Sequence, residues 1–148
     1  MDIPHAGRHP RPSNRPHVSV AVRSEAGEPW PLRSAALRLP ITVRIGGLLL
    51  FPHGDRAVLA RAVVADAELL DFHAEVHRLT IAWGDALPTS SPGAWSPHLT
   101  LARRLRREDV PRAVEALAPP PERLVLDRLR VWDGHRHEVI GLYPSESV

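Results

Sequence analysis

The sequence predicts an α+β fold in which about six mostly antiparallel strands pack against two or three helices. Residues 42–51 and 57–64 are apolar runs of strand length on either side of a Pro-His-Gly-Asp turn, a pattern typical of an antiparallel hairpin. Leu69, Phe72 and Val76 begin a series with spacings of three and four residues, which puts them on one face of a helix. A chain of 148 residues can enclose its own core, so one domain is expected.

The first half of the chain is expected to start with an arm and then to alternate strands and helices. Residues 1–16 are rich in proline and arginine and predict a flexible arm, so the folded domain is placed at 17–148. A first strand is predicted at 17–22 and a short helix at 32–39. In the next strand, Gly46-Gly47 predicts a bulge or a close backbone approach. Asp66 is expected to begin the helix that carries the apolar series.

The second half is expected to contain a strand, a short helix and a final hairpin. A strand begins at His98, and the acidic residues and proline that follow Arg107 predict the start of a helix. Residues 123–132 read as one strand and residues 137–143 as its antiparallel partner across an Asp-Gly turn. The sum is an antiparallel α+β arrangement rather than a repeat or a parallel sheet.

The amino-acid composition limits where in the cell the protein is expected and which functional groups a site can contain. The chain has no cysteine, which excludes disulfides, thiol nucleophiles and thiolate metal sites. The longest apolar run, residues 45–51, is too short to cross a membrane, and no signal peptide is apparent, so a cytoplasmic location and no membrane partner are expected. All 19 basic residues are arginine, but the formal charge is only +2. A polyanionic partner is therefore permitted but not required.

A histidine followed two residues later by a hydroxyl side chain occurs twice at the start of an apolar strand. His17 and Ser19 form the first pair, and His98 and Thr100 form the second. Residues i and i+2 of a strand share one face, so each imidazole lies beside its hydroxyl. The two pairs are about half the chain apart, as expected if two similar lobes each contribute one strand. The paired pattern predicts a site that handles phosphate.

Around these pairs the chain resembles the 2H phosphoesterase superfamily, in particular the RNA 2′,3′-cyclic phosphodiesterase and 2′-5′ RNA ligase-like proteins. The resemblance is carried by His17-Val18-Ser19-Val20, by Pro-His-Leu-Thr-Leu-Ala-Arg at residues 97–103, and by the order of the elements between them. It covers about residues 16–144. It implies a bilobal fold in which two mostly antiparallel sheets flank a cleft with helices outside, and phosphodiester chemistry without a metal or other cofactor.

Two features depart from the family pattern. The family has a strand and a helix before its first motif, whereas here a proline-rich stretch precedes His17, so the first lobe is expected to be abbreviated. A truncated chain, or a homodimer in which a second molecule completes the lobe, would explain the same feature, because the first motif's strand otherwise has an open edge. Ser19 also replaces the commoner threonine but keeps the hydroxyl group.

The chemistry implied by the resemblance assigns a role to each motif residue. Opening a 2′,3′-cyclic phosphate at an RNA end or on a small nucleotide needs a base, an acid and donors for the developing negative charge. His17 and His98 are the predicted acid and base, in an order that the sequence does not assign. Ser19 and Thr100 are the predicted phosphate-binding hydroxyls. Arg103 matches an arginine common after the second motif and is the third predicted phosphate-binding residue, but strand parity turns it away from His98 unless the strand bends there.

Alternative interpretations accompany these assignments. His73 and His77, spaced i and i+4 on a helix, would suit a zinc pair, but Ala74 stands where a metalloprotease helix has glutamate, so a solvated or packed face is expected. Trp95 either stacks on a base or packs in the core. A catalytically inactive RNA- or nucleotide-binding module of the same fold is the rival function, and a truncated product without independent function is a third.

Overall fold

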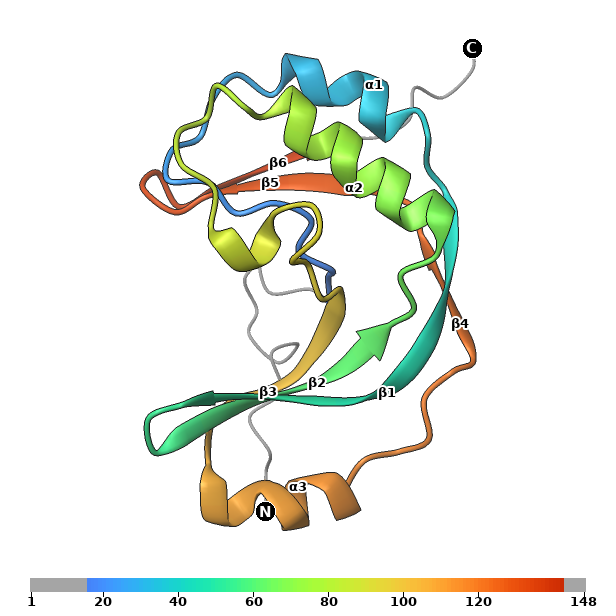
Figure 1. The fold of residues 1–148 in the computed structure, drawn as a ribbon, viewed down its shortest axis with the longest axis vertical. Helices are drawn as coiled ribbons and strands as arrows, with labels where there is room; N and C mark the ends of the chain where they lie inside the picture. The colour runs from blue at the N-terminus through green and yellow to red at the C-terminus, as the bar shows by residue number, and fades with distance from the viewer. Residues whose placement is uncertain (1–15, 143–148) are drawn as a thin grey trace.

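The computed structural model describes residues 16–142 and shows a strongly curled antiparallel sheet with helices at both ends (Figure 1). The expected α+β class is confirmed. The elements are, in chain order, η2 (Trp30–Leu32), α1 (Arg33–Ala36), β1 (Ile41–His53), β2 (Arg56–Val63), α2 (Ala67–Leu79), η3 (Pro88–Ser90), β3 (His98–Arg106), η4 (Arg107–Asp109), α3 (Val110–Glu115), β4 (Arg123–Leu126), β5 (Leu129–Asp133) and β6 (Glu138–Leu142).

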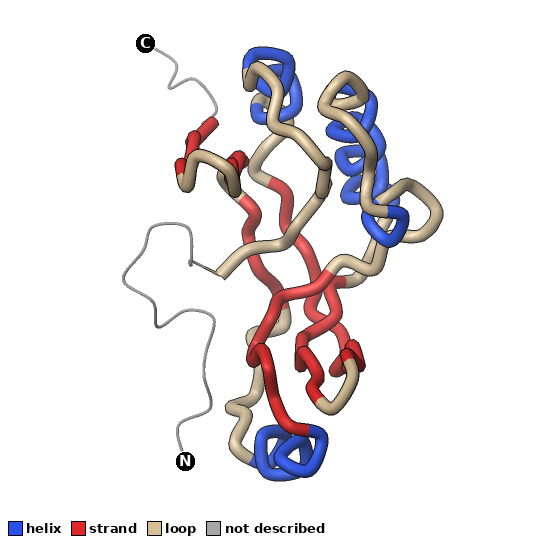
Figure 2. The backbone as a smooth tube through the Cα atoms, turned by 90° about the vertical axis from the view of Figure 1, so that its left-hand side faces the viewer, coloured by secondary structure: helices blue, strands red, loops and turns tan. Residues whose placement is uncertain are grey.

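The strands form two antiparallel groups. The larger sheet has the order β3-β2-β1-β4, and β5 pairs with β6 in a separate hairpin. Helices α1 and α2 lie near β5 and β6 at one end of the molecule, while α3 lies at the other end beneath β1, β2 and β3 (Figure 1). Seen from the side, α1 and α2 cover one side of the strands at their end (Figure 2). The long strand β1 joins the two ends.

The β1–β2 hairpin has the predicted irregularity at Gly46-Gly47. Ile45 pairs with Val63, but the next pair is Leu48 with Arg61, so β1 carries one extra residue here. A Cβ added to Gly46 would lie 3.2 Å from the Cβ of Ala62. The structure therefore shows both of the predicted alternatives, a bulge and a close approach between two strands.

Helix α2 begins where the sequence predicts, because Asp66 caps it. The Asp66 carboxylate accepts a hydrogen bond from the Leu69 backbone N–H at 2.9 Å, which satisfies one of the unpaired donors of the first turn. The apolar face of α2 packs into the larger of two cores, together with residues of α1, β1 and β5 that are also buried. A second core lies between the other end of the sheet and α3; it consists of Leu59, Ala102, Leu105 and Ala113.

Replacing Asp66 with alanine is expected to destabilise the protein by about 1 kcal/mol, the usual worth of an N-cap side chain. Asp66→Asn keeps an oxygen acceptor and is the matched control, which should retain most of the stability. Urea unfolding measures both variants. Equal midpoints for wild type and Asp66→Ala would show that the cap contributes nothing.

Residues 17–22 do not form the predicted strand. Only an isolated bridge is present, between Val18 and Leu99. This register puts Val20 opposite Pro97, which has no N–H to donate, and the Pro97 carbonyl already accepts from the Val63 N–H at 2.9 Å. Pro16, opposite Leu101, stops the ladder in the other direction. A proline on each side therefore limits the pairing to one bridge.

Three other boundaries differ from the predictions. The expected single strand at 123–132 is two strands in different sheets, because β4 pairs with β1 whereas β5 pairs with β6. Helix α1 stops at Ala36 rather than continuing through the predicted range to residue 39. The apolar spacing of α2 continues to Trp83 and predicts an end at Gly84, but the helix ends at Leu79, where the Thr80 hydroxyl donates to the Val76 carbonyl at 2.9 Å. The predicted return strand at 137–143 is β6, and residue 143 lies outside the described part, as do residues 1–15 of the predicted arm.

Candidate active site

The Val18–Leu99 bridge brings the two histidine motifs side by side. In its antiparallel register His17 lies opposite Thr100 and Ser19 lies opposite His98. Val18 and Leu99 pack against the larger core, so their neighbours on both segments face the other way. We call this side of the sheet, with His17, Ser19, His98 and Thr100, the motif face. Directly opposed side chains on such a pair have Cβ atoms roughly 5 Å apart and diagonal ones roughly 7–8 Å.

The motif residues are accessible. Ser19 is exposed, and both histidines and Thr100 are half-buried. His17 and His98 occupy a diagonal of the pair, with one hydroxyl beside each imidazole. The structure brings together all four residues that the two motifs supply.

His98 is held by two contacts. Its Nδ1 lies 2.7 Å from the Ser96 carbonyl oxygen. A carbonyl only accepts, so Nδ1 carries the hydrogen, and in the neutral ring Nε2 is the free acceptor. The ring also packs against Phe51, with centroids 4.7 Å apart and planes tilted by 45°. The Phe51 contact could not be predicted from the sequence, because it joins β1 and β3, which are not neighbouring strands in the sheet.

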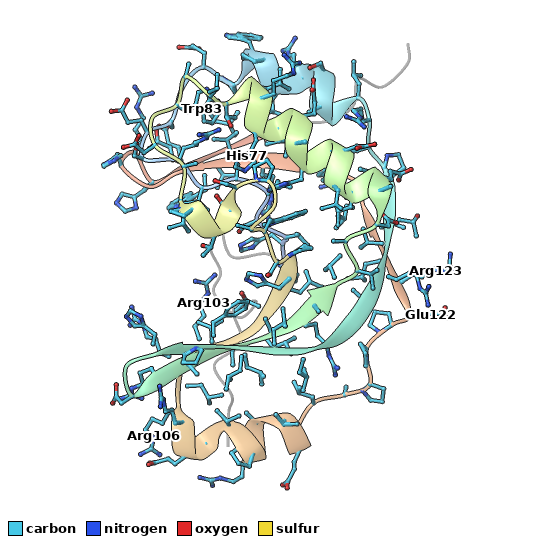
Figure 3. The ribbon with its side chains drawn as sticks, in the orientation of Figure 1. His77, Trp83, Arg103, Arg106, Glu122 and Arg123 are labelled. Atoms are coloured by element: carbon cyan, nitrogen blue, oxygen red, sulfur yellow. The ribbon has the colours of Figure 1, made fainter. Side chains whose placement is uncertain are left out.

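Arg103 lies on the motif face, which strand parity alone did not predict. Thr100 pairs with Ala60, but Ala102 pairs with Leu59, and both Ala102 and Leu59 belong to the second core, between the sheet and α3. One extra residue in β3 thus shifts the alternation between Thr100 and Ala102, and Arg103 returns to the side of Thr100. A second irregularity follows at Arg104, whose φ is 52°. Figure 3 shows Arg103 on the side of β3 away from α3.

A cluster of three rings connects α2 to both motif-bearing segments. His73 and Trp95 are stacked, with centroids 3.9 Å apart and an interplanar angle of 1°, and His77 lies 4.6 Å from His73. Each ring donates to a backbone carbonyl: His73 Nε2 to Ser90 at 2.8 Å, His77 Nε2 to Val20 at 3.2 Å and Trp95 Nε1 to Ser19 at 3.0 Å. These bonds fix the backbone beside His17 and the loop that leads to His98.

The two cluster histidines are buried, so neither is a solvated helix face. Burial lowers the pKa of His73, and the neighbouring His77 lowers it further. Burial also lowers the pKa of His77, as does the positive charge of Arg23. Both rings are therefore held in the neutral form that donates one N–H. The two histidines have a structural role, since the Nε2 atom of each ring is hydrogen-bonded to a backbone carbonyl.

Arg23 attaches the N-terminal segment to the end of α2. Its guanidinium donates to the His77 carbonyl at 2.9 Å and to the Thr80 hydroxyl at 3.3 Å. A cation at a helix C-terminus also interacts favourably with the helix dipole. Backbone bonds from Ser24 to Asp85 and from Leu87 to Val22, both 2.9 Å, extend the attachment. In Figure 3, the label of His77 lies beside the helix α2.

A hollow of about 730 Å³ lies elsewhere, between residues 25–30 and the β5–β6 hairpin, and includes none of the predicted site residues. Its lining contains four carboxylates and one guanidinium, a balance that disfavours a phosphate; they belong to Glu25, Glu28, Asp133, Glu138 and Arg136. Among residues 16–142 no group of three or more His, Asp or Glu side chains is arranged to hold a metal ion. In the same range, no helix is both long and apolar enough to cross a membrane.

Comparison with known proteins identifies the family to which this geometry corresponds. The model of the family described as the 2′-5′ RNA ligase superfamily matches residues 31–138. The matched range is well over half of the chain; it contains His98, Thr100 and Arg103 and begins after His17. No curated protein and no solved structure gives a significant match.

Proposed function

Because the chain belongs to the 2′-5′ RNA ligase superfamily, which is the 2H phosphoesterase superfamily, we propose that it is a metal-independent phosphodiesterase. Its substrates are 2′,3′-cyclic phosphates, or 2′-5′ linkages, at RNA ends or on small nucleotides. The observation that carries the proposal is the Val18–Leu99 bridge, whose register gathers two imidazoles and two hydroxyls on one accessible face. Two imidazoles near neutral pH can supply one base and one acid.

The proposed step adds one water molecule across a P–O bond of the cyclic phosphate. One imidazole, neutral, takes a proton from water as the water oxygen bonds to phosphorus. The other, protonated, gives a proton to the ribose oxygen as the bond from that oxygen to phosphorus breaks. For His98 the exchanging atom is Nε2, since Nδ1 is bound to the Ser96 carbonyl. The product is a phosphate monoester beside a free hydroxyl group.

The hydroxyls of Ser19 and Thr100 stabilise the extra negative charge of the transition state by donating to the non-bridging oxygens. Arg103, on the same face, supplies a permanent positive charge with two parallel donors that suit a phosphate. The rival function, a nucleotide-binding module without turnover, is favoured by one observation: the segment that carries His17 pairs with β3 through an isolated bridge rather than as a strand.

Turnover of nucleoside 2′,3′-cyclic phosphates and 2′-5′ dinucleotides in the presence of EDTA tests the proposal. We expect hydrolysis by the wild type, and a fall in kcat/KM of about 10- to 100-fold in Thr100→Val, the worth of one hydrogen bond to a charged group. Thr42→Val, an exposed threonine elsewhere on the larger sheet, is the matched control. Binding without hydrolysis of any of these substrates would favour the binding module instead, and full activity in Thr100→Val would remove Thr100 from the site.

A further inference from the structure

Strands β1 and β4 carry two arginines directly opposite each other. Arg44 pairs with Arg123 in the antiparallel register, and both side chains are exposed. Like charges in this position are destabilising. Arg123 Nε lies 3.9 Å from a Glu122 carboxylate oxygen, at the limit of an ion pair, and Arg44 has no acidic partner within residues 16–142. Figure 3 shows Arg123 beside Glu122, with its side chain directed outward from the strand.

Arg44 and Arg123 share the motif face. His98 pairs with Ala62, and a Cβ on Gly46 would point at the Ala62 side chain, so Gly46 is on the same side as His98. Arg44 precedes Gly46 by two residues and therefore has the same orientation. Ile45, between them, packs against the larger core on the other side. The cross-strand pairing then puts Arg123 beside Arg44 on the motif face.

The strip of sheet between His98 and these two arginines carries no large side chain. The residues that cross it are Ala62 on β2 and Gly46 on β1, which bring little or no side chain. Neighbouring strands are about 4.8 Å apart, so Gly46 lies roughly 10 Å from His98. Neither residue puts a large side chain between the motif pair and β4, along the direction that a bound chain would follow. The next polar groups that such a chain meets are the two guanidinium groups.

We propose that Arg44 and Arg123 bind a phosphate of an RNA chain beyond its reacting end, which makes an oligoribonucleotide a better substrate than a mononucleotide. The inference rests on the proposed function, whose motif face it extends. An anion between the two guanidinium groups removes their mutual repulsion and accepts from both. Guanidinium is suited to this role because its planar donors match phosphate oxygens in pairs.

The test compares two substrates that share one reacting group: a nucleoside 2′,3′-cyclic phosphate and an oligoribonucleotide that ends in the same cyclic phosphate. In Arg44→Gln/Arg123→Gln we expect kcat/KM for the oligonucleotide to fall about tenfold or more, since charge-assisted contacts are lost. We expect no change for the mononucleotide. The slope of log kcat/KM against log salt for the oligonucleotide should become shallower by about 0.7 for each phosphate contact removed.

The matched control is Arg33→Gln/Arg38→Gln, which removes the same charge at the end of the molecule covered by α1. Equal losses in the two double variants would reduce the effect to net charge and overturn the subsite. So would equal losses on both substrates, or none. Binding of a 3′-phosphorylated oligoribonucleotide by fluorescence anisotropy covers the case of an inactive protein. Weaker binding in Arg44→Gln/Arg123→Gln alone would then support the subsite even though the hydrolase proposal had failed, and unchanged binding would refute it.

Discussion

Replacing His98 with alanine is expected to lower kcat for cyclic-phosphate opening by about 10²- to 10⁴-fold, the usual contribution of a general acid or base. In the proposed mechanism the imidazole moves a proton in the transition state, whereas the hydroxyls and Arg103 bind the phosphate, so the loss is expected in kcat. The half-buried ring is not part of either core, so the fold should survive. Single-turnover kinetics with circular dichroism separate the two effects.

His17→Ala is expected to have a loss of the same order, and the double variant should be little worse than either single one. Acid and base act as a unit in one step, so their effects are not additive. His135→Ala, in the exposed β5–β6 turn, is the matched control and should be fully active. Normal turnover in His17→Ala would show that His17 takes no part in the reaction. This result would contradict the mechanism with two histidines, whatever the activity of His98→Ala.

Acidification from pH 7.5 to 5 is expected to destabilise the fold through His73 and His77. Their pKa values are lowered in the folded protein, whereas the unfolded chain titrates near 6.5. Below about pH 6.5 the unfolded state therefore binds more protons than the folded state, and stability falls as pH falls. The slope is up to about 1.4 kcal/mol per pH unit for each histidine. Above about pH 7.5, where the unfolded histidines are also neutral, the same groups leave stability independent of pH.

Urea unfolding at a series of pH values measures this slope, and three variants identify its source. His73→Gln and His77→Gln replace each ring with a group that can still donate to the same carbonyl but does not titrate, so each should flatten the slope. His53→Gln, at an exposed position at the end of β1, should leave it unchanged. A slope that persists in the first two variants would place the titrating groups elsewhere. The Asp109 and Asp133 carboxyls, whose pKa values are lowered by Arg106 and by the Arg136 backbone N–H respectively, act only at more acidic pH.

The sequence was sufficient for those features that local patterns specify. Alternation and turn residues predicted the β1–β2 hairpin, its glycine bulge and the β5–β6 turn, and the N-cap and apolar spacing predicted α2. The motif pairs and the order of elements predicted the family. The same rules failed at residues 17–22, where the alternation is that of a strand but the opposing Pro97 cannot continue a ladder. Pairing partners far along the chain decide that outcome.

Arg103 illustrates a second limit. Its face depends on an extra residue between Thr100 and Ala102, and nothing in Leu101-Ala102 signals that a bulge is present. The cluster of His73, His77 and Trp95 was similarly hidden, because the spacing of the two histidines fits a metal pair as well as a buried contact. Only the approach of Ser19, Val20 and Ser90 to these rings decides between them. Side-chain environment, unlike strand and helix periodicity, is set by tertiary contacts.

Residues 16–25 carry His17 and Ser19, one half of the candidate site, and are bound non-covalently to the part of the domain that carries His98 and Thr100. Two isolated bridges, the ring-to-carbonyl and guanidinium contacts and a few loop bonds hold this segment, without a continuous ladder. We therefore expect docking of this segment to be an equilibrium of its own, with an effective concentration set by the chain that tethers it. A substrate that touches both motifs binds only the docked form and shifts that equilibrium toward it. Substrate affinity and the order of the N-terminal segment are thus two measures of one free energy.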